Sequence, residues 1–240
     1  MIVAGVDDAG RGSVLGPLVI AGVSIDESKV PKLVELGVKD SKLLTAARRR
    51  KLFKDIKAIS DQVTWTRIKP DDIDSYVLNG VRLFRLNYLE AKHMALVLGR
   101  LKYDLAYVDC CDTDQKRFGK LIESLMQEQD GKCGAAFGSS QEPDSCKIRS
   151  EHHADRNYPV VSAASIIAKV TRDTYISRLQ REHGLFGSGY PSDPDTVEFL
   201  RGFISKSQKL PDFTRTSWKT IDRLNQEFEM RVRIDDYLNG

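Results

Sequence analysis

Two short apolar runs of the sequence each end in aspartate, and this feature constrains the fold most. The first run, Ile2–Val6, is followed by Asp7 and Asp8. The second run, Leu105–Val108, is followed by Asp109. Short apolar runs of this kind are typical of strands buried inside a sheet. Because the ends of neighbouring strands can meet at one edge of a sheet, the pattern predicts that acids far apart in the sequence lie close together.

Helical patterns separate most of the predicted strands. The first two strands enclose a glycine-rich turn and predict an antiparallel hairpin, whereas the later strands alternate with helices. This combination predicts an α/β fold, with a mixed β-sheet that has helices on both faces and a helical C-terminal part. The predicted strands are 2–6, 17–25, 63–68, 105–109 and 146–151, and the predicted helices are 27–36, 45–59 with Thr45 as N-cap, 79–101, 115–129 and 160–183.

The composition is that of an ordinary globular protein with one complete core. The chain has 240 residues, of which 41% are hydrophobic, and a net charge of only +3. Its four cysteines include the adjacent pair Cys110 and Cys111 and show no C-x-x-C spacing, so neither a zinc site nor a disulfide framework is expected. No apolar run is long enough for a membrane span or a signal peptide, so we expect a cytoplasmic protein without membrane contact.

A fourth acid, Asp155, lies in the segment EHHADRNYPVVSAAS before the last long predicted helix. Carboxylate oxygens are ligands that suit Mg²⁺ or Mn²⁺, and two such ions can activate a water for phosphodiester hydrolysis. An isolated acid at a strand end is more often a turn former or a helix cap, so the residue types alone leave both interpretations open. Asp7 and Asp8 can share one site only if the chain turns at Asp8, because successive strand residues face opposite sides.

A series of motifs runs along the chain after the opening string GVDDAGRGSVLGPLVIAG. These motifs are KDSKLL at 39–44, AYVD at 106–109, HAD…YPVVSAASIIAKVTRD at 153–173, GSGYPSDP at 187–194 and RTSWKT at 215–220. The opening string resembles the motif D-E-A-G-R-G of the type 2 ribonuclease H family, ribonuclease HII, and the other motifs follow in the order of its archaeal form. The resemblance implies a ribonuclease-H-like core over residues 1–183 and a helical extension with substrate contacts over residues 184–240.

The resemblance also implies which residues form the site. The tyrosine that stacks near the deoxyribose after the ribonucleotide corresponds to Tyr190, and the phosphate contacts of the KDSK motif correspond to Ser41 and Lys42. Lys169 is a further candidate for substrate contact; it shares a helix face with Ser162 and Ser165 that we otherwise interpret as packing. The metal-binding carboxylates correspond to Asp7, Asp8, Asp109 and Asp155, and the ribonucleotide-sensing loop corresponds to Gly10, Arg11 and Gly12.

The activity implied is that of a monomeric two-metal endoribonuclease. Such an enzyme cuts the RNA strand of RNA–DNA hybrids and the 5′ side of single ribonucleotides in duplex DNA, and leaves a 3′-hydroxyl and a 5′-phosphate. Asp8 departs from the motif, which has Glu there, and its shorter side chain retracts the carboxylate by about 1.5 Å. A weakly active or non-catalytic hybrid-binding protein is therefore the alternative. A DNA-cutting resolvase or transposase is a second one, against which the GRG loop and Tyr190 argue.

Basic residues gather in two places. One group follows the KDSK motif, and the other lies in the C-terminal part. Such groups form either a solvated face or a surface that contacts phosphates without reading sequence, and the sequence leaves both open. The members are Arg48, Arg49, Arg50, Lys51, Lys54 and Lys57 in the first group, and Lys206, Lys209, Arg215, Lys219, Arg223, Arg231 and Arg233 in the second.

Overall fold

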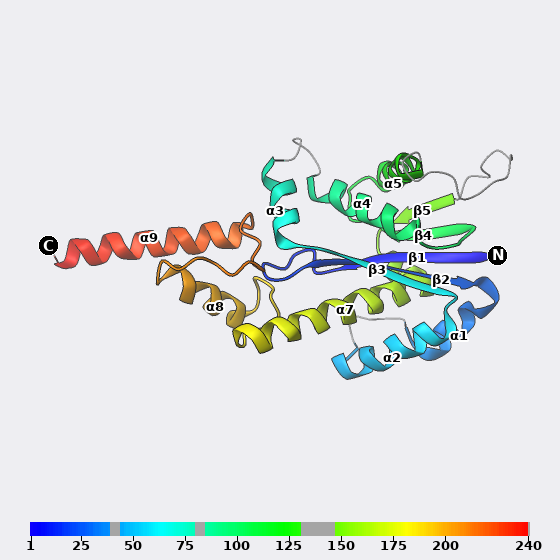
Figure 1. The fold of residues 1–240 in the computed structure, drawn as a ribbon, viewed down its shortest axis with the longest axis horizontal. Coiled ribbons are helices and arrows are strands. Elements are labelled where there is room, and N and C mark those ends of the chain that lie inside the picture. The colour runs from blue at the N-terminus through cyan, green and yellow to red at the C-terminus, as the bar shows by residue number, and fades with distance from the viewer. Residues whose placement is uncertain (39–43, 80–84, 131–146, 240) are drawn as a thin grey trace. The chain divides into compact units, whose positions relative to one another are not determined.

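The computed structural model describes residues 1–38, 44–79, 85–130 and 147–239 (Figure 1). The chain forms two compact units that alternate along the sequence. The predicted division at residues 183 and 184 stays a prediction. Unit 1 comprises Met1–Ala9, Val19–Arg67 and Val81–Thr171, and unit 2 comprises Gly10–Leu18, Ile68–Gly80 and Arg172–Gly240.

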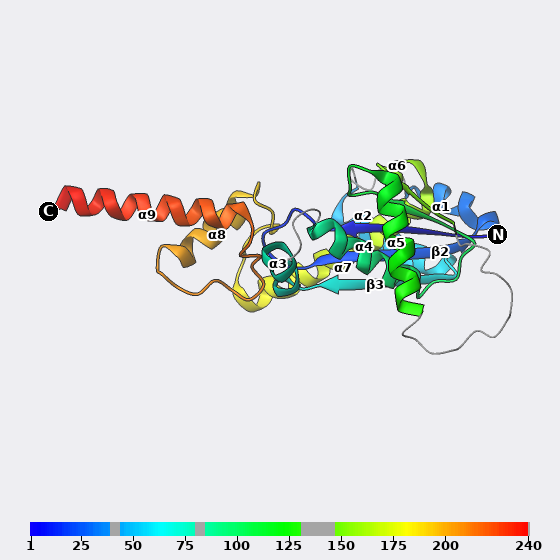
Figure 2. The same ribbon diagram turned by 90° about the horizontal axis from the view of Figure 1, so that it is seen from above.

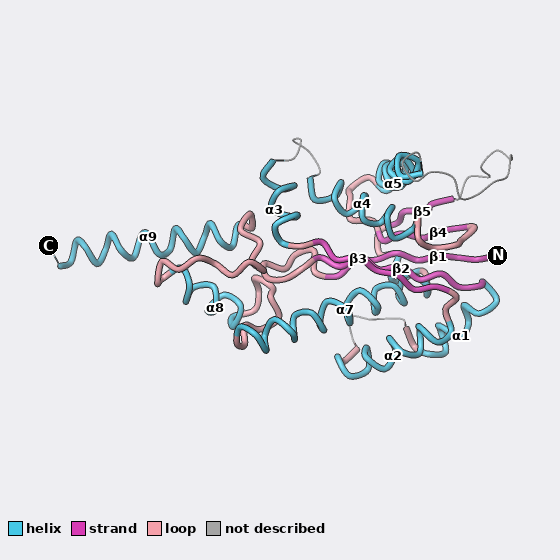
Figure 3. Tube along the Cα trace, in the orientation of Figure 1, coloured by secondary structure: helices cyan, strands magenta, loops and turns pink. Residues whose placement is uncertain are grey.

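A five-stranded sheet has the strand order β3-β2-β1-β4-β5 (Figure 3). β1 pairs with β2 in antiparallel and with β4 in parallel orientation, and β4 pairs with β5 in parallel orientation. The predicted mixed sheet is therefore confirmed. The strands are β1 (Ile2–Ala9), β2 (Leu18–Asp26), β3 (Gln62–Ile68), β4 (Leu105–Asp109) and β5 (Lys147–Glu151).

Helices cover both faces of the sheet, and two strand glycines show how closely they approach. A Cβ atom on Gly5 would lie 2.4 Å from the carbonyl carbon of Val160 in α7 (Pro159–His183). A Cβ atom on Gly22, which pairs with Val6, would lie 2.5 Å from Cγ1 of Val97 in α4 (Arg85–Leu98). Because Gly5 and Val6 are successive strand residues, these contacts lie on opposite faces. The predicted helices on both faces are confirmed.

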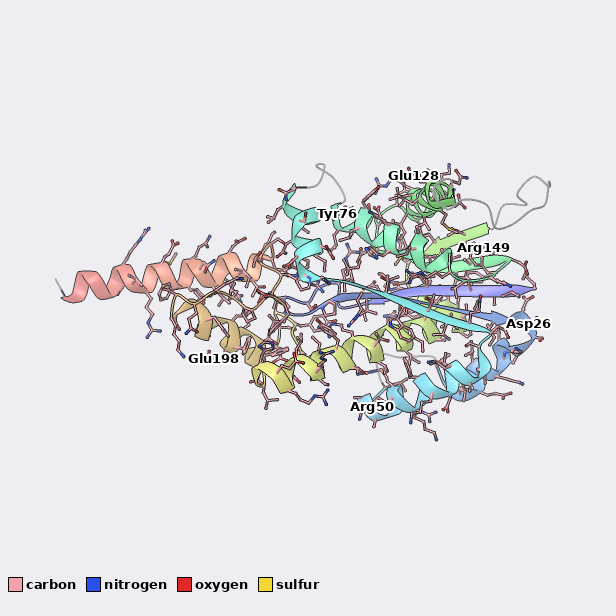
Figure 4. All side chains as sticks on the ribbon, in the orientation of Figure 1. Asp26, Arg50, Tyr76, Glu128, Arg149 and Glu198 are labelled. Atoms are coloured by element: carbon pink, nitrogen blue, oxygen red, sulfur yellow. The ribbon has the colours of Figure 1, made fainter. Side chains whose placement is uncertain are left out.

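Unit 1 holds its helices in two groups. α1 and α2 lie on one side of the sheet and α4 and α5 on the other (Figure 1), and Figure 2 shows α5 alongside α4. Figure 4 shows Arg50 on the outer side of α2, where it is exposed. The helical elements are a 3-10 turn (Glu27–Lys29), α1 (Val30–Leu36), α2 (Ala46–Ile59), α4 (Arg85–Leu98), α5 (Gln115–Asp130), α6 (Ala154–Asn157) and residues 159–171 of α7 (Pro159–His183).

Unit 2 has its own apolar core. A bridge between Leu15 and Thr214 joins the turn after β1 to the C-terminal segment, and Phe186 stacks on Phe213 with ring centroids 5.4 Å apart. No helix in the described ranges is both long enough and apolar enough to cross a membrane. The helices are α3 (Pro70–Asn79), α8 (Pro194–Ile204), α9 (Lys219–Asn239) and the remainder of α7.

The helices predicted over residues 45–59, 115–129 and 160–183 are confirmed to within one residue at each end. Thr45 caps α2 by accepting a hydrogen bond from the Arg48 N–H at 3.2 Å, as predicted. The helix predicted over residues 79–101 is wrong in its bounds: Asn79 ends α3, and α4 ends at Leu98. After α4, the N–H groups of Arg100 and Leu101 donate turn hydrogen bonds to the carbonyls of Val97 and Leu98.

Candidate active site

Asp7 and Asp109 lie on the same face of the sheet, on the adjacent parallel strands β1 and β4. In the β1–β4 register, Gly5 is opposite Tyr107, so two residues further along Asp7 and Asp109 continue the same row. Gly5 faces α7, and the two acids therefore also lie on the face that α7 covers. The parallel pairing brings together two acids that are far apart in the sequence, as predicted from the strand ends.

α6 brings Asp155 to this face. The N–H of Ala154 donates a hydrogen bond to Oδ1 of Asp109 at 2.8 Å, and Asp155 is the next residue. His153 adopts a left-handed conformation with φ of 58° at the start of α6, so the chain turns sharply there. Asp155 is buried in this short helix rather than in a loop before α7.

Asp7 is buried in a negatively charged environment. Burial, followed by the charges of Asp8 and Asp109, raises the pKa of Asp7 well above its usual range. A hydrogen bond from the side chain of Ser165 and one from the Asp8 N–H, at 2.7 Å to Oδ1, lower that pKa in part. The carboxylates therefore concentrate negative charge where little water can screen it.

Two serines of α7 hold the acids. The hydroxyl of Ser162 donates to the backbone carbonyl of Asp155, and the side chain of Ser165 hydrogen-bonds to Asp7. Nζ of Lys169 donates to Oγ of Ser165 at 2.9 Å. The sequence interpretation of this helix face as mainly packing missed the contacts of both serines. Their three- and four-residue spacing was the available signal.

The chain does not turn at Asp8. β1 stays paired with β2 through Asp8–Ile20 and Ala9–Val19, and the turn begins at Gly10, where φ is 94°. The turn that would let Asp8 share the site of Asp7 is therefore not present at Asp8, because the antiparallel ladder continues past it. In a regular strand the side chain of Asp8 leaves the face opposite to that of Asp7.

Within unit 2, the GRG loop is a tight turn with an open second glycine. The N–H and the hydroxyl of Ser13 both donate to the carbonyl of Gly10, at 3.3 and 2.9 Å. A Cβ atom on Gly12 would meet no atom within 4 Å, and Gly12 is exposed. Packing therefore does not require glycine at position 12.

Tyr190 lies half-buried in the GSGYPSDP segment, with its ring centroid 4.6 Å from the guanidinium carbon of Arg172. Ser41 and Lys42 lie outside the described residues.

The family model for ribonuclease HII matches residues 4–221 of the chain. The chain belongs to the ribonuclease HII family. Members of this family are metal-dependent endoribonucleases.

Known ribonucleases HII resemble the chain over almost its full length. The ribonuclease HII of Pyrococcus furiosus is 40% identical over 233 residues, which are 96% of this chain and 94% of that protein. The crystal structure of ribonuclease H2 from Pyrococcus horikoshii OT3 matches with a TM-score of 0.80 and 41% identity, and covers 95% of this chain and 99% of that one. The PCNA:RNase HII complex from Archaeoglobus fulgidus contains a chain that matches with a TM-score of 0.78 and 36% identity, over 92% of this chain and 96% of that one.

The acids of this chain have the donor chemistry for a hard divalent cation. In the described ranges, no three or more His, Cys, Asp or Glu side chains are grouped closely enough to hold a metal ion by themselves. Mg²⁺ needs no such cage, because in nucleotide-processing sites one or two carboxylates bind it together with water and substrate phosphates. Burial, followed by the charges of Asp8 and Asp109, raises the pKa of Asp7. A bound cation would neutralise these carboxylates, so the residues present fit the metal.

One member of the C-terminal basic group, Arg215, is not on the surface. Arg215, grouped from the sequence with the C-terminal basic residues, is fully buried in unit 2. Its Nε donates to the carbonyl of Gly16 at 3.1 Å, and Nη1 donates to the carbonyl of Arg11 at 2.8 Å. Arg215 therefore belongs neither to a solvated face nor to a phosphate-contacting surface, because its guanidinium holds the backbone of the GRG turn.

Proposed function

We propose that this protein hydrolyses the RNA strand of RNA–DNA hybrids and the 5′ phosphodiester of single ribonucleotides embedded in duplex DNA, leaving a 3′-hydroxyl and a 5′-phosphate. The convergence of Asp7, Asp109 and Asp155 on one sheet face carries this proposal, in a chain of the ribonuclease HII family. As expected from the sequence, we propose that it acts as a cytoplasmic monomer.

Asp7, Asp109 and Asp155 would hold two divalent cations, Mg²⁺ or Mn²⁺. Asp8 starts on the opposite face of β1, so it would serve as the fourth carboxylate only by reaching around the strand. When bound, the ions supply an activated water and neutralise the charge of the leaving oxygen. Ser165 favours the ionised form of Asp7 by donating to its carboxylate. The Ala154 N–H holds Oδ1 of Asp109 and so fixes the direction of its other oxygen.

Residues of unit 2 would recognise the ribonucleotide. The 2′-hydroxyl is the group that distinguishes ribose from deoxyribose, and backbone groups beside Gly10 and Gly12 can approach a sugar closely. The open space at Gly12 supports this role. Arg11 would contact a phosphate, and Tyr190 would stack near the following sugar.

Lys169, Ser41 and Lys42 would contact the phosphates of the substrate. Lys169 already lies beside the site, because its ammonium group donates to Ser165, which hydrogen-bonds to Asp7. A lysine there also adds positive charge next to three carboxylates. Ser41 and Lys42 enter the proposal on the KDSK motif alone.

Cleavage mapping on three duplexes tests the proposal. The substrates are a DNA duplex with one ribonucleotide, an RNA–DNA hybrid and an all-DNA duplex, each with Mg²⁺ or Mn²⁺. We expect a cut on the 5′ side of the single ribonucleotide and multiple cuts in the hybrid, and neither with Asp7→Asn. Cleavage of the all-DNA duplex would favour a DNA-cutting enzyme, and binding of the hybrid without cleavage would favour the non-catalytic alternative.

A further inference from the structure

Arg172 of α7 is a buried arginine that contacts both of the segments proposed to recognise the ribonucleotide. It is 4% exposed and belongs to unit 2. Its guanidinium lies over the ring of Tyr190, 4.6 Å from the centroid, and Nη2 donates to the carbonyl of Ser188 at 3.0 Å. On the other segment, a Cβ atom on Gly10 would lie 2.5 Å from Nε of Arg172.

The two segments are also joined to each other beside this guanidinium. The N–H groups of Val14 and Leu15 donate to the carbonyl of Gly189, at 2.8 and 3.1 Å. A Cβ atom on Gly189 would lie 2.9 Å from the carbonyl oxygen of Leu15 and 3.3 Å from Nη2 of Arg172. Gly10 and Gly189 both have positive φ, 94° and 82°. The side chain of Arg172 therefore occupies the space that any other residue at Gly10 would need.

This arrangement is costly for stability. Burial lowers the pKa of Arg172 and so opposes its charged form. Arg172 forms an ion pair with the half-exposed Asp173, in which Nη1 lies 3.9 Å from Oδ1. Nε is buried and meets no hydrogen-bond acceptor in the part of the chain that the structure describes. An apolar residue of similar volume would avoid this desolvation.

We propose that Arg172 is a positioning residue for ribonucleotide recognition: its guanidinium sets the placement of the Tyr190 ring relative to the turn at Gly10. This inference rests on the proposed function. Only a planar guanidinium can stack on the ring while its edge donates to the Ser188 carbonyl; a lysine ammonium cannot do both. Arg172 is not proposed to contact the substrate, because Tyr190 and the glycine turn cover it.

The test compares KM and kcat on a DNA duplex with one ribonucleotide. The variants are Arg172→Lys, Arg172→Met, Tyr190→Ala and the double variant R172M/Y190A. Arg178→Met is the matched control, because Arg178 lies on the same helix but is exposed and paired with Glu182. We expect both Arg172 variants to raise KM roughly tenfold and to change kcat less than about threefold. Once Tyr190 is alanine, Arg172→Met should raise KM less than about twofold further.

Calorimetry on each variant establishes that it is folded. If Arg172→Met does not fold, Arg172→Lys carries the comparison, and if neither folds, Arg172 is purely structural and the proposal is wrong. Unchanged KM in both variants, or effects of Arg172 and Tyr190 that multiply independently, also overturns it. The activity of the wild type separates the proposed function from the positioning role of Arg172. If the wild type does not cut the single-ribonucleotide duplex, the proposed function fails. If it cuts and the variants match it, only the positioning role fails.

Discussion

The ammonium group of Lys169 donates a hydrogen bond to the hydroxyl of Ser165, with 2.9 Å between Nζ and Oγ. Ser165 in turn hydrogen-bonds to Asp7, so a row of polar groups on α7 ends at the buried acid. Burial and two neighbouring carboxylates favour the protonated form of Asp7, whereas this row favours the ionised form. Ser165 therefore supports the proposed metal site and does not serve only as a packing residue.

Ser165→Ala should weaken the metal site without unfolding the protein. Without the hydroxyl, Asp7 loses one hydrogen bond to its ionised form and holds its proton more tightly. We expect cleavage to require roughly three- to tenfold more Mg²⁺ for half-maximal rate, since one hydrogen bond to a charged group contributes about 1 kcal/mol or more. Ser28→Ala is the control, because Ser28 also donates to a carboxylate, Asp26, but at an exposed position. Equal Mg²⁺ requirements for Ser165→Ala and wild type would contradict the role of the serine.

Asp7→Asn should stabilise the protein in metal-free buffer. The pKa of Asp7 is higher in the folded protein than in the unfolded chain, so the folded state binds this proton more tightly. The unfolding free energy of the wild type therefore falls as the pH rises from the usual carboxyl range through the raised pKa of Asp7, and stays lower above it. Asparagine carries no charge, so the variant escapes this loss.

Calorimetry at two pH values measures this difference. Well above the raised pKa of Asp7 we expect the variant to melt about 2–4 °C higher, the shift that about 1 kcal/mol causes in a chain of this size. Below the usual carboxyl range the difference should vanish. Added Mg²⁺ should stabilise the wild type and leave Asp7→Asn unchanged, because ligand binding stabilises only a state that binds it. If Asp7→Asn is less stable than the wild type at high pH, the buried charge of Asp7 does not destabilise the folded protein, and the prediction is wrong.

Features that depend on local sequence could be predicted, and features that depend on tertiary packing could not. The strand ending in Asp109 and the Thr45 cap follow from residue types a few positions apart. The contacts of Ser162 with α6 do not, because they depend on which helix covers the sheet. Arg215 shows the same limit: its charge predicts exposure, and only the fold reveals the carbonyl groups of Arg11 and Gly16 that it binds.

The two glycines of the GRG loop should respond differently to alanine. Gly10→Ala places a Cβ atom 2.5 Å from Nε of Arg172 at a positive φ of 94°, so we expect a loss of roughly 1–3 kcal/mol in unfolding free energy. Gly12→Ala meets no atom within 4 Å and should change stability by less than about 0.5 kcal/mol. If the loop approaches the ribose closely, Gly12→Ala should nevertheless raise KM for a single-ribonucleotide duplex roughly tenfold. Denaturant unfolding and steady-state kinetics separate the effects, and normal KM in Gly12→Ala would exclude a close approach at that residue.

Asp8→Glu should raise activity. β1 remains a regular paired strand through Ala9, so the side chain of Asp8 starts on the face opposite to Asp7 and must reach around the strand to share its site. Glutamate, the residue of the family motif, has one more methylene, which extends the carboxylate by about 1.5 Å. We expect kcat/KM with Mg²⁺ to rise roughly three- to tenfold, which corresponds to about 0.6–1.4 kcal/mol of transition-state stabilisation.

Asp8→Asn is the matched control, because it keeps the length of Asp8 and removes its charge. If the carboxylate at position 8 contributes only through its electric field on Asp7, aspartate and glutamate there should give the same activity. Only Asp8→Asn should then differ from the wild type. If this carboxylate is a metal ligand whose side chain is too short, Asp8→Glu should raise activity and Asp8→Asn should lower it. A lower rate for Asp8→Glu would mean that the aspartate is already well placed and that the site has adapted to the shorter side chain.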